Sequence, residues 1–412
     1  MNILFLHPNF PAQFMNLASV MGRNPRHRVV FITAREQDEI PGVQKVLFKA
    51  PRAVHPNTHP YIHSVESAVL QGQSVYRSAA ELKRTGFVPD VIVGHSGWGS
   101  TLYMKDLFPQ SALVGYFEWF YHAHGTDLDF DPAAPLTEAN KLRVRTINAP
   151  FLFDLCACDA GISPTRWQQQ QFPPEYHHKI SVLHDGIDTE RYCPKPGVGL
   201  VLPEQGIDLP AGTEIITYVG RGMEPYRGFP QFMEAMSLLM ARRPGLHVVV
   251  VGADRVAYGG EKAPDGKSFK EHMLETFSYD LSRIHFTGLL PRYLYLQVLQ
   301  ASAVHAYLTR PFVLSWSLLE AMAAGCMIVA SDTAPVREVI HDGINGLLVD
   351  FFSPQQMVLK IEAALEDRQQ AAVMRQRARE TIVEGYDIRR LLPQTLQFLE
   401  ETAAQVRRRS VV

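Results

Sequence analysis

The sequence predicts an α/β protein made of two Rossmann-like lobes, each built on a parallel sheet. Short β-rich runs alternate with amphipathic helical patterns along most of the 412 residues, which is typical of parallel strands joined by crossover helices. A proline- and glycine-rich segment, residues 194–212, interrupts this alternation once. The length also exceeds one ordinary core and suits two domains of about 200 residues each.

In the first half, five apolar runs predict strands and four amphipathic runs predict helices. The predicted strands cover residues 3–7, 29–32, 91–94, 112–117 and 160–162. The predicted helices begin at Phe14, Tyr61, Gly99 and Glu138.

The same alternation resumes after residue 212, and the chain ends in helical pattern. The predicted strands cover residues 215–219, 246–251, 284–286, 304–307 and 327–330, and the predicted helices begin at Gly228, Arg292 and Ser315. We read residues 194–212 as too irregular for a regular element. We therefore expect an N-terminal domain over 1–195, a C-terminal domain over 212–385, and a helix over 386–412 that packs back toward the first domain.

Charge and cysteine content exclude several classes of protein. The 40 Lys and Arg residues are balanced by 42 Asp and Glu residues, so no bulk basic field favours nucleic acid. Four cysteines without a Cys-x-x-Cys pair predict neither a disulfide framework nor zinc. With no signal peptide and no long apolar run, we expect a cytoplasmic protein. The basic clusters at 141–145 and 407–409 leave peripheral contact with the inner membrane face open, beside the alternative of solvated faces.

The first candidate site follows the predicted strand 215–219. Residues 220–228 read Gly-Arg-Gly-Met-Glu-Pro-Tyr-Arg-Gly, so Gly220, Arg221, Gly222 and Arg227 stand between a strand end and a helix start. Glycine lets the backbone approach a phosphate, a helix N-terminus supplies N–H donors, and guanidinium groups pair with phosphate oxygens. The alternative is a helix-start turn with solvated arginines.

A second candidate site lies at the start of the predicted helix from Ser315. The first amides of this helix, with those of Val313 and Leu314 before it, can meet an anion. Glu320 would lie on the second turn, where a carboxylate can accept both hydroxyls of a ribose. The alternative for Glu320 is an exposed helical glutamate.

These segments together resemble the retaining glycosyltransferases of family 4, which have the GT-B fold. The resemblance is carried by residues 218–228, 283–288, 318–325 (Leu-Leu-Glu-Ala-Met-Ala-Ala-Gly) and 331–349, and by Ser-Val-Leu-His-Asp-Gly-Ile-Asp at 181–188. It spans essentially the whole chain and is strongest from 213 to 350. It implies a nucleotide-sugar donor in the C-terminal lobe, an acceptor in the N-terminal lobe, and a reaction in a central cleft.

The resemblance also assigns donor-binding roles. Arg221 matches the diphosphate-binding arginine, and Arg227 stands where the family usually has lysine, one residue beyond the commonest spacing. The implied base pocket lies around Gly288, Leu289 and Leu290, and Gly252, also a donor-binding candidate, ends another predicted strand that faces the cleft.

Phe312 is the largest departure from the family pattern. Eight residues before Glu320, the family usually has a glutamate that touches the donor sugar, and this chain has Phe312. A phenyl ring cannot accept a hydrogen bond from a sugar hydroxyl. The substitution therefore bears on recognition of the sugar, whereas backbone amides can still bind the diphosphate.

In the acceptor lobe, Glu118 and His122 follow the predicted strand 112–117 among four aromatic residues. Related enzymes carry a histidine or acid here that is directed at the donor sugar, and Glu118 matches that position best. We therefore name Glu118 and His122 as catalytic candidates beside Arg221 and Arg227. The alternative is an aromatic core with satisfied polar groups.

Two loops at predicted strand ends supply candidates for the acceptor. His95 and Trp98 follow the strand 91–94, and Asn9 and Gln13 follow the first strand. Beside Asn9 the family usually has a glycine pair near the donor phosphate, and this chain has proline and alanine at positions 11 and 12.

Two sequence patterns resemble metal sites but lack a required feature, so no metal or cofactor is expected. Three histidines are spaced by four, but prolines 56 and 60 preclude one continuous helix face; they are His55, His59 and His63. Four acids occupy calcium-loop positions, but a proline replaces the glycine that the sharp turn needs; they are Asp127, Asp129, Asp131 and Glu138.

The predicted function is transfer of a hexose, with retention and without metal, from a UDP- or GDP-type sugar to an acceptor hydroxyl. The acceptor would be a glycan, a lipid-linked sugar or a small molecule, as in polysaccharide or glycoconjugate biosynthesis. The alternative, favoured by Phe312, is a non-catalytic nucleotide-sugar-binding protein or partner subunit. An NAD-dependent oxidoreductase is disfavoured because no G-x-G-x-x-G motif follows a predicted strand.

Overall fold

The computed structural model describes residues 1–260 and 262–409, which divide into two compact units. The N-terminal unit is Met1–Gly186 together with the C-terminal segment from Arg389, and the C-terminal unit is Ile187–Ile388. The first boundary therefore falls at residue 186, before the 194–212 segment that we expected to separate the domains.

The N-terminal unit contains a seven-stranded parallel sheet in the order β3-β2-β1-β4-β5-β6-β7. Its strands are β1 (Asn2–Leu6), β2 (Arg28–Thr33), β3 (Val43–Leu47), β4 (Val91–His95), β5 (Ala112–Tyr116), β6 (Ala160–Ser163) and β7 (Ile180–Val182). Its helices are α1 (Met15–Arg23), α2 (His63–Arg84), α3 (Met104–Leu107), α4 (Glu138–Ile147), α5 (Ala149–Ala157), α6 (Arg166–Gln169) and α14 (Ile388–Arg409).

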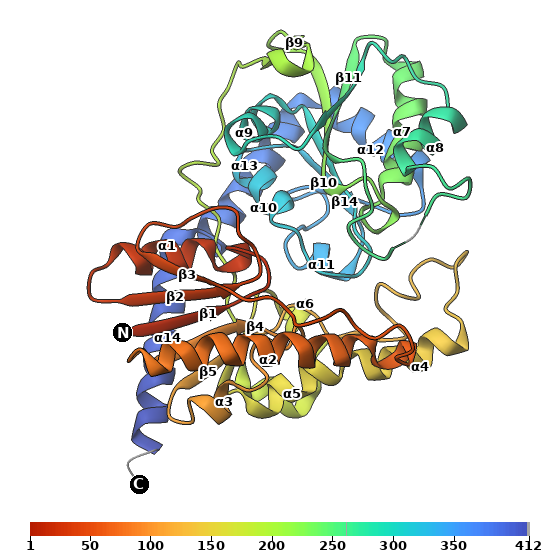
Figure 1. Ribbon diagram of the computed structural model, residues 1–412. Helices are drawn as coiled ribbons and strands as arrows, with labels where there is room; N and C mark the ends of the chain where they lie inside the picture. The colour runs from red at the N-terminus through yellow and green to blue at the C-terminus, as the bar shows by residue number, and fades with distance from the viewer. Residues whose placement is uncertain (261, 410–412) are drawn as a thin grey trace. The chain divides into compact units, whose positions relative to one another are not determined.

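Side-chain alternation on β1 divides this unit into two cores. Ile3 and Phe5 pack with α1 and α14, where Leu399, Ala403 and Val406 are buried, whereas the other face of the sheet packs with α2, α3 and α5. Figure 1 shows α14, in blue, beside the red N-terminal strands. The last helix therefore completes the core of the first unit.

The predicted helix from Gly99 is wrong, because the chain forms turns there before the short helix α3. Gly97 and Gly99 both have positive φ, at 86° and 83°. A Cβ on Gly99 would lie 2.0 Å from the carbonyl oxygen of Ala68 in α2. Close packing on α2 therefore holds this loop in a conformation that a helix cannot adopt.

The C-terminal unit contains a six-stranded parallel sheet in the order β12-β11-β10-β13-β14-β15. Its strands are β10 (Glu214–Gly222), β11 (Leu246–Ala253), β12 (Ile284–Gly288), β13 (Val304–Tyr307), β14 (Ile328–Ser331) and β15 (Leu347–Val349). Its helices are α7 (Phe229–Arg242), α8 (Phe269–Thr276), α9 (Arg292–Ala301), α10 (Trp316–Ala323), α11 (Ala334–Arg337), α12 (Pro354–Glu366) and α13 (Arg368–Gly385). Figure 1 shows α9, α10 and α13 on one side of this sheet and α7, α8 and α12 on the other.

The segment 194–212 is more regular than its composition predicts. It contains an antiparallel pair, β8 (Leu200–Leu202) and β9 (Ile207–Leu209). The inward-facing residues of this pair are buried against β10, β11 and α9, so the hairpin belongs to the core of the C-terminal unit. Alternation of apolar and polar residues over three positions was too short to outweigh the prolines and glycines around it.

No helix in the described part of the chain is long and apolar enough to cross a membrane.

Candidate functional site

The sequence candidates gather at strand ends in each unit, as expected for open parallel sheets. In the C-terminal unit, the candidates for binding phosphate lie on a donor loop (residues 220–228, beginning within the last three residues of β10) and on the segment 308–315 between β13 and α10. In the N-terminal unit they follow β1, β4 and β5.

Arg221 carries an exposed guanidinium on the donor loop. Its Nη1 donates one hydrogen bond, of 3.4 Å, to the hydroxyl of Tyr258, and it forms no ion pair within residues 1–260 and 262–409. An exposed cation without a carboxylate partner is available to an anionic ligand.

Arg227 is buried instead, with 6% of its surface exposed. Its Nη1 donates to Tyr307 Oη (3.2 Å), Thr309 Oγ1 (2.7 Å) and the Val313 carbonyl oxygen (3.1 Å). Arg227 therefore anchors the 308–315 segment to the donor loop. The position of Arg227 in the motif predicted a positive charge at the donor site, but it did not predict this anchoring role.

The start of α10 offers two amides to a ligand. The Ser315 amide donates to Tyr307 Oη at 2.9 Å, so it is occupied in this structure. The amides of Val313 and Leu314 have no acceptor among the described residues. Together with the N-terminus of α10, they are suited to phosphate oxygens.

Glu320 lies on the second turn of α10, half-buried, where Tyr295 Oη donates to its Oε2 at 2.8 Å. Burial raises the pKa of the Glu320 carboxyl, and hydrogen bonds from Tyr295 and Tyr192 oppose this effect. The carboxylate is therefore an oriented acceptor, and sequence reasoning missed both tyrosines.

The predicted donor-site glycines make close backbone contacts in this structure. A Cβ on Gly252 would lie 2.4 Å from the carbonyl oxygen of Gly220, and one on Gly222 would lie 2.3 Å from that of Arg255. Gly288 has a φ of 68° and is followed by the exposed Leu289 and half-buried Leu290.

Phe312 lies in an aromatic cluster formed with Tyr226 and Tyr258. Its ring centroid is 5.6 Å from each of theirs, and 8% of its surface is exposed. At the position where the family usually has a sugar-binding glutamate, the structure therefore has a largely buried aromatic cluster.

Glu118 is the centre of the cluster in the N-terminal unit. Its Oε1 accepts from Gln13 Nε2 at 3.0 Å, and its Oε2 lies 3.3 Å from His95 Nε2. The half-exposed Trp98 lies over the same region, 6.5 Å from the His95 ring between centroids. The structure thus brings together three residues that are far apart in sequence and places Trp98 beside them.

His7 joins this cluster and was missed by sequence reasoning. Its ring is edge-on to His95 at 4.9 Å, and its Nδ1 accepts from the Asn9 amide at 2.8 Å. Burial, and the nearby His95, lower the pKa of His7, which favours the neutral ring. Asn9 itself is exposed. Ala12 has a φ of 49°, in the left-handed region where glycine is usual.

His122 lies among different partners. Its Nε2 is 2.8 Å from the carbonyl oxygen of Gln171, and its ring is 5.8 Å from that of Phe120. The structure gives it no contact with Glu118 or His95 among the described interactions.

Side chains of the two sequence patterns considered for metals form hydrogen bonds with nearby backbone groups. His55 and His59 accept backbone amides two residues on, and His63 Nε2 lies 2.7 Å from Thr58 O. Asp129 accepts the amides of Gly125 and Thr126. Within the described residues, no group of three or more His, Cys, Asp or Glu side chains is arranged to hold a metal ion.

Asp154 supports the loop that carries Trp98. Its carboxylate is buried and accepts from the Gly97 amide (2.8 Å) and Thr101 Oγ1 (2.5 Å). Burial raises its pKa from 3.8 to about 6, although both hydrogen bonds act in the opposite direction.

This shift predicts a pH dependence of stability. A pKa raised in the folded state adds stability below the unfolded pKa and loses it as the pH rises through the folded value. Relative to the non-titrating variant Asp154→Asn, the free energy of unfolding of the wild type should therefore fall by about 2 kcal/mol between pH 4 and pH 7. Urea unfolding of both proteins at each pH measures this difference, and a difference that is constant with pH would contradict it.

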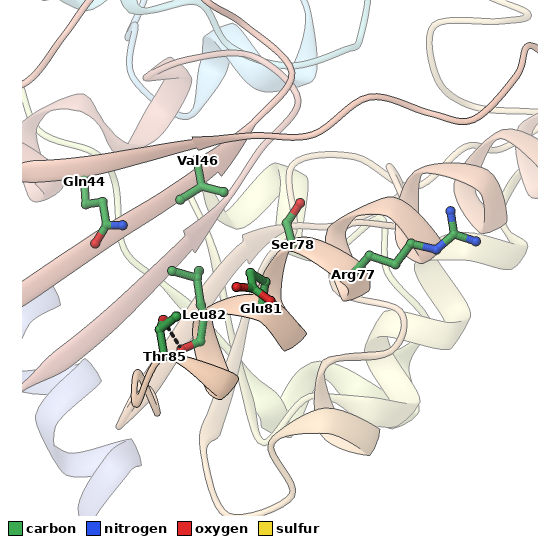
Figure 2. A pocket seen from close by; sticks show the side chains of 7 residues that line it. All are labelled: Gln44, Val46, Arg77, Ser78, Glu81, Leu82 and Thr85. Atoms are coloured by element: carbon green, nitrogen blue, oxygen red, sulfur yellow. Dashed lines mark hydrogen bonds between the residues drawn. The ribbon is translucent and has the colours of Figure 1, made fainter.

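A separate hollow lies between the edge strand β3 and α2 (Figure 2). Its wall includes Val46, Arg77 and Glu81, and none of the predicted site residues.

Two family models match this chain. One describes the glycosyl transferase family 4 group and matches residues 25–192, and the other describes glycosyl transferases group 1 and matches residues 204–381. The chain belongs to the family 4 glycosyltransferases. The family membership expected from the motifs is therefore confirmed.

Curated relatives of this glycosyltransferase chain are matched over part of their length. The D-inositol 3-phosphate glycosyltransferase of Corynebacterium glutamicum is 26% identical over 48% of each chain. The alpha-maltose-1-phosphate synthase of Mycolicibacterium smegmatis is 25% identical over 55% of this chain and 58% of its own. The matched segment spans about half the length of these relatives.

Solved structures show that this family member has the predicted GT-B fold. Anabaena HepE, in complex with UDP, superposes with a TM-score of 0.67 and 17% identity over 97% of this chain and 100% of its own. The sucrose-phosphate synthase of Thermosynechococcus elongatus superposes with a TM-score of 0.69 and 17% identity, over 98% of this chain and 100% of its own.

Proposed function

We propose that this protein is a retaining glycosyltransferase that moves a hexose from a nucleotide-diphosphate sugar to an acceptor hydroxyl. The proposal is carried by the excess of hydrogen-bond donors at the ends of β10 and β13. Arg221 is an exposed cation without an ion pair in the described residues, and the amides of Val313 and Leu314 lack acceptors there. Such a cluster binds a diphosphate, and Glu320 is oriented to accept hydroxyls of the attached ribose.

In the proposed reaction, the acceptor oxygen bonds to the anomeric carbon while the bond from that carbon to the diphosphate oxygen breaks on the same face. The leaving diphosphate takes the acceptor proton. Arg221 and Arg227 stabilise the negative charge that grows on the diphosphate, and this charge is larger in the transition state than in the ground state. These cations remove the need for a bound metal ion.

For the acceptor, we propose the cluster in the N-terminal unit. Glu118 is held by Gln13 and His95, and the exposed face of Trp98 offers an apolar surface for a sugar ring. Relatives named for inositol phosphate and maltose phosphate favour a polyhydroxylated acceptor.

A donor panel tests the proposal. UDP-glucose, UDP-N-acetylglucosamine, GDP-mannose and ADP-glucose are added to the protein, and its thermal unfolding is recorded. One donor should raise Tm, because a ligand that binds only the folded state stabilises it by RT ln(1+[L]/Kd). That donor should release its nucleoside diphosphate when polyhydroxylated acceptors are added, in EDTA as well as without it.

The other outcomes of this panel separate the alternatives. If no donor stabilises the protein, the proposal is wrong. Stabilisation without release, with any acceptor, would support the non-catalytic nucleotide-sugar-binding alternative that Phe312 raises. Loss of turnover in EDTA would contradict the metal-independent mechanism.

A further inference from the structure

Two loops of the C-terminal unit approach each other closely: the donor loop and a facing loop (residues 254–260, after β11). The approach requires glycine at 222, because a Cβ there would lie 2.3 Å from the carbonyl oxygen of Arg255. Glu224, which is fully buried, joins the two loops. Its Oε2 accepts the amides of Ala257 and Tyr258, the second at 2.7 Å.

This carboxylate determines where Tyr258 lies. With its backbone held by Glu224, the Tyr258 ring lies beneath the Arg227 guanidinium, 5.3 Å from ring centroid to Cζ. The Phe312 ring packs against the Tyr258 ring in a T-shaped arrangement. The Tyr258 hydroxyl then accepts the hydrogen bond from Arg221. A single side chain therefore contacts both arginines of the donor loop.

The hydroxyl of Tyr258 is also a donor without an acceptor. It accepts from Arg221, and no acceptor for its own O–H lies among the described residues. With the amides of Val313 and Leu314, this makes three donors near Arg221 and Arg227 whose hydrogens have no acceptor among residues 1–260 and 262–409. An anion bearing several oxygens would satisfy all of them.

We propose that Tyr258 is a third side chain that contacts the diphosphate, beside Arg221 and Arg227, and that Glu224 is the positioning residue that holds it there. This inference rests on the proposed donor site. It explains why a carboxylate is buried beside two arginines without pairing with either by a direct contact. Oε2 is used by the facing loop, and Oε1 has no hydrogen-bond partner in the described chain.

The test is calorimetric titration of the whole protein with UDP, GDP and ADP. Each variant is then titrated with the diphosphate that binds the wild type most tightly. Tyr258→Phe keeps the ring and removes the O–H, so Kd should rise roughly tenfold, as for loss of one hydrogen bond to a charged group. Affinity for the corresponding nucleoside, which lacks phosphate, should not change. Tyr279→Phe is the matched control, because it removes a hydroxyl bonded to a backbone oxygen in the same unit.

Two substitutions at Glu224 separate positioning from charge. Glu224→Gln keeps an oxygen for both amides and removes the negative charge, so the diphosphate should bind at least as tightly as in the wild type. Glu224→Ala removes the acceptor for the Tyr258 amide, and Kd should rise as in Tyr258→Phe. The double variant Glu224→Ala/Tyr258→Phe should bind no more weakly than either single variant, because both remove one interaction.

The outcomes distinguish this inference from the function on which it rests. If the wild type binds none of the three diphosphates, the donor site itself is wrong. A second outcome is that the wild type binds one diphosphate, and that Arg221→Ala weakens this binding whereas Tyr258→Phe does not. In that case the donor site stands and the proposed role of Tyr258 is wrong. Equal diphosphate affinities of Glu224→Gln and Glu224→Ala would overturn the positioning role of Glu224. If Glu224→Ala does not fold, the affinity of Tyr258→Phe still tests the role of Tyr258.

Discussion

Replacing Arg221 by alanine is expected to lower turnover by about 100-fold or more while leaving stability unchanged. The side chain is exposed and its only hydrogen bond in the described chain is long, at 3.4 Å, so folding gains little from it. Its charge, in contrast, acts on the diphosphate as the bond to the sugar breaks. Steady-state kinetics with the cognate donor, together with thermal unfolding, measure both parts.

A matched control for Arg221→Ala is Arg242→Ala in the same unit. Arg242 is an exposed arginine on α7 that pairs with Glu362 at 3.1 Å, and an ion pair of this kind contributes little. The control should keep wild-type turnover. A turnover of Arg221→Ala close to that of Arg242→Ala would remove Arg221 from the mechanism.

Replacing Arg227 by alanine is expected to affect both activity and stability. Turnover should fall by about 100-fold or more. The free energy of unfolding should fall by about 1 to 3 kcal/mol, because the oxygens of Thr309 and Val313 lose a buried charged donor. Kinetics and urea unfolding of the same preparation separate the two effects.

Arg227→Lys distinguishes charge from anchoring. Lysine keeps the positive charge but cannot reproduce the guanidinium geometry that reaches Tyr307, Thr309 and the Val313 carbonyl. We expect this variant to recover most of the lost turnover and only part of the lost stability. Wild-type turnover in Arg227→Ala would contradict the role of Arg227 at the donor site.

Patterns local in the sequence predicted much of the fold. Strand β13 matches its predicted bounds, because Thr309, Arg310 and Pro311 soon interrupt the short apolar run that forms it. Strand β3 was missed because its sequence, Val-Gln-Lys-Val-Leu, mixes buried and exposed positions at the edge of the sheet. The β8–β9 hairpin was missed for a similar reason, since its strands are three residues long.

The sequence predicted those parts of the candidate site whose residues belong to a single short motif. Arg221 and Arg227 share a loop, so spacing alone placed both near a strand end. Glu224 and Tyr258 are joined across two loops, a separation that no periodicity encodes. Asp154 lies in the apolar helix α5 and supports a loop more than fifty residues earlier, a contact visible only in the folded chain.

The most direct test of the donor site is a crystal structure of the protein with its cognate nucleotide sugar. We expect the diphosphate oxygens within about 2.7–3.2 Å of the Arg221 guanidinium and of the amides of Val313 and Leu314. The Tyr258 hydroxyl should then donate to one of these oxygens. A diphosphate bound elsewhere in the chain, with these groups left without an acceptor, would contradict the proposed donor site.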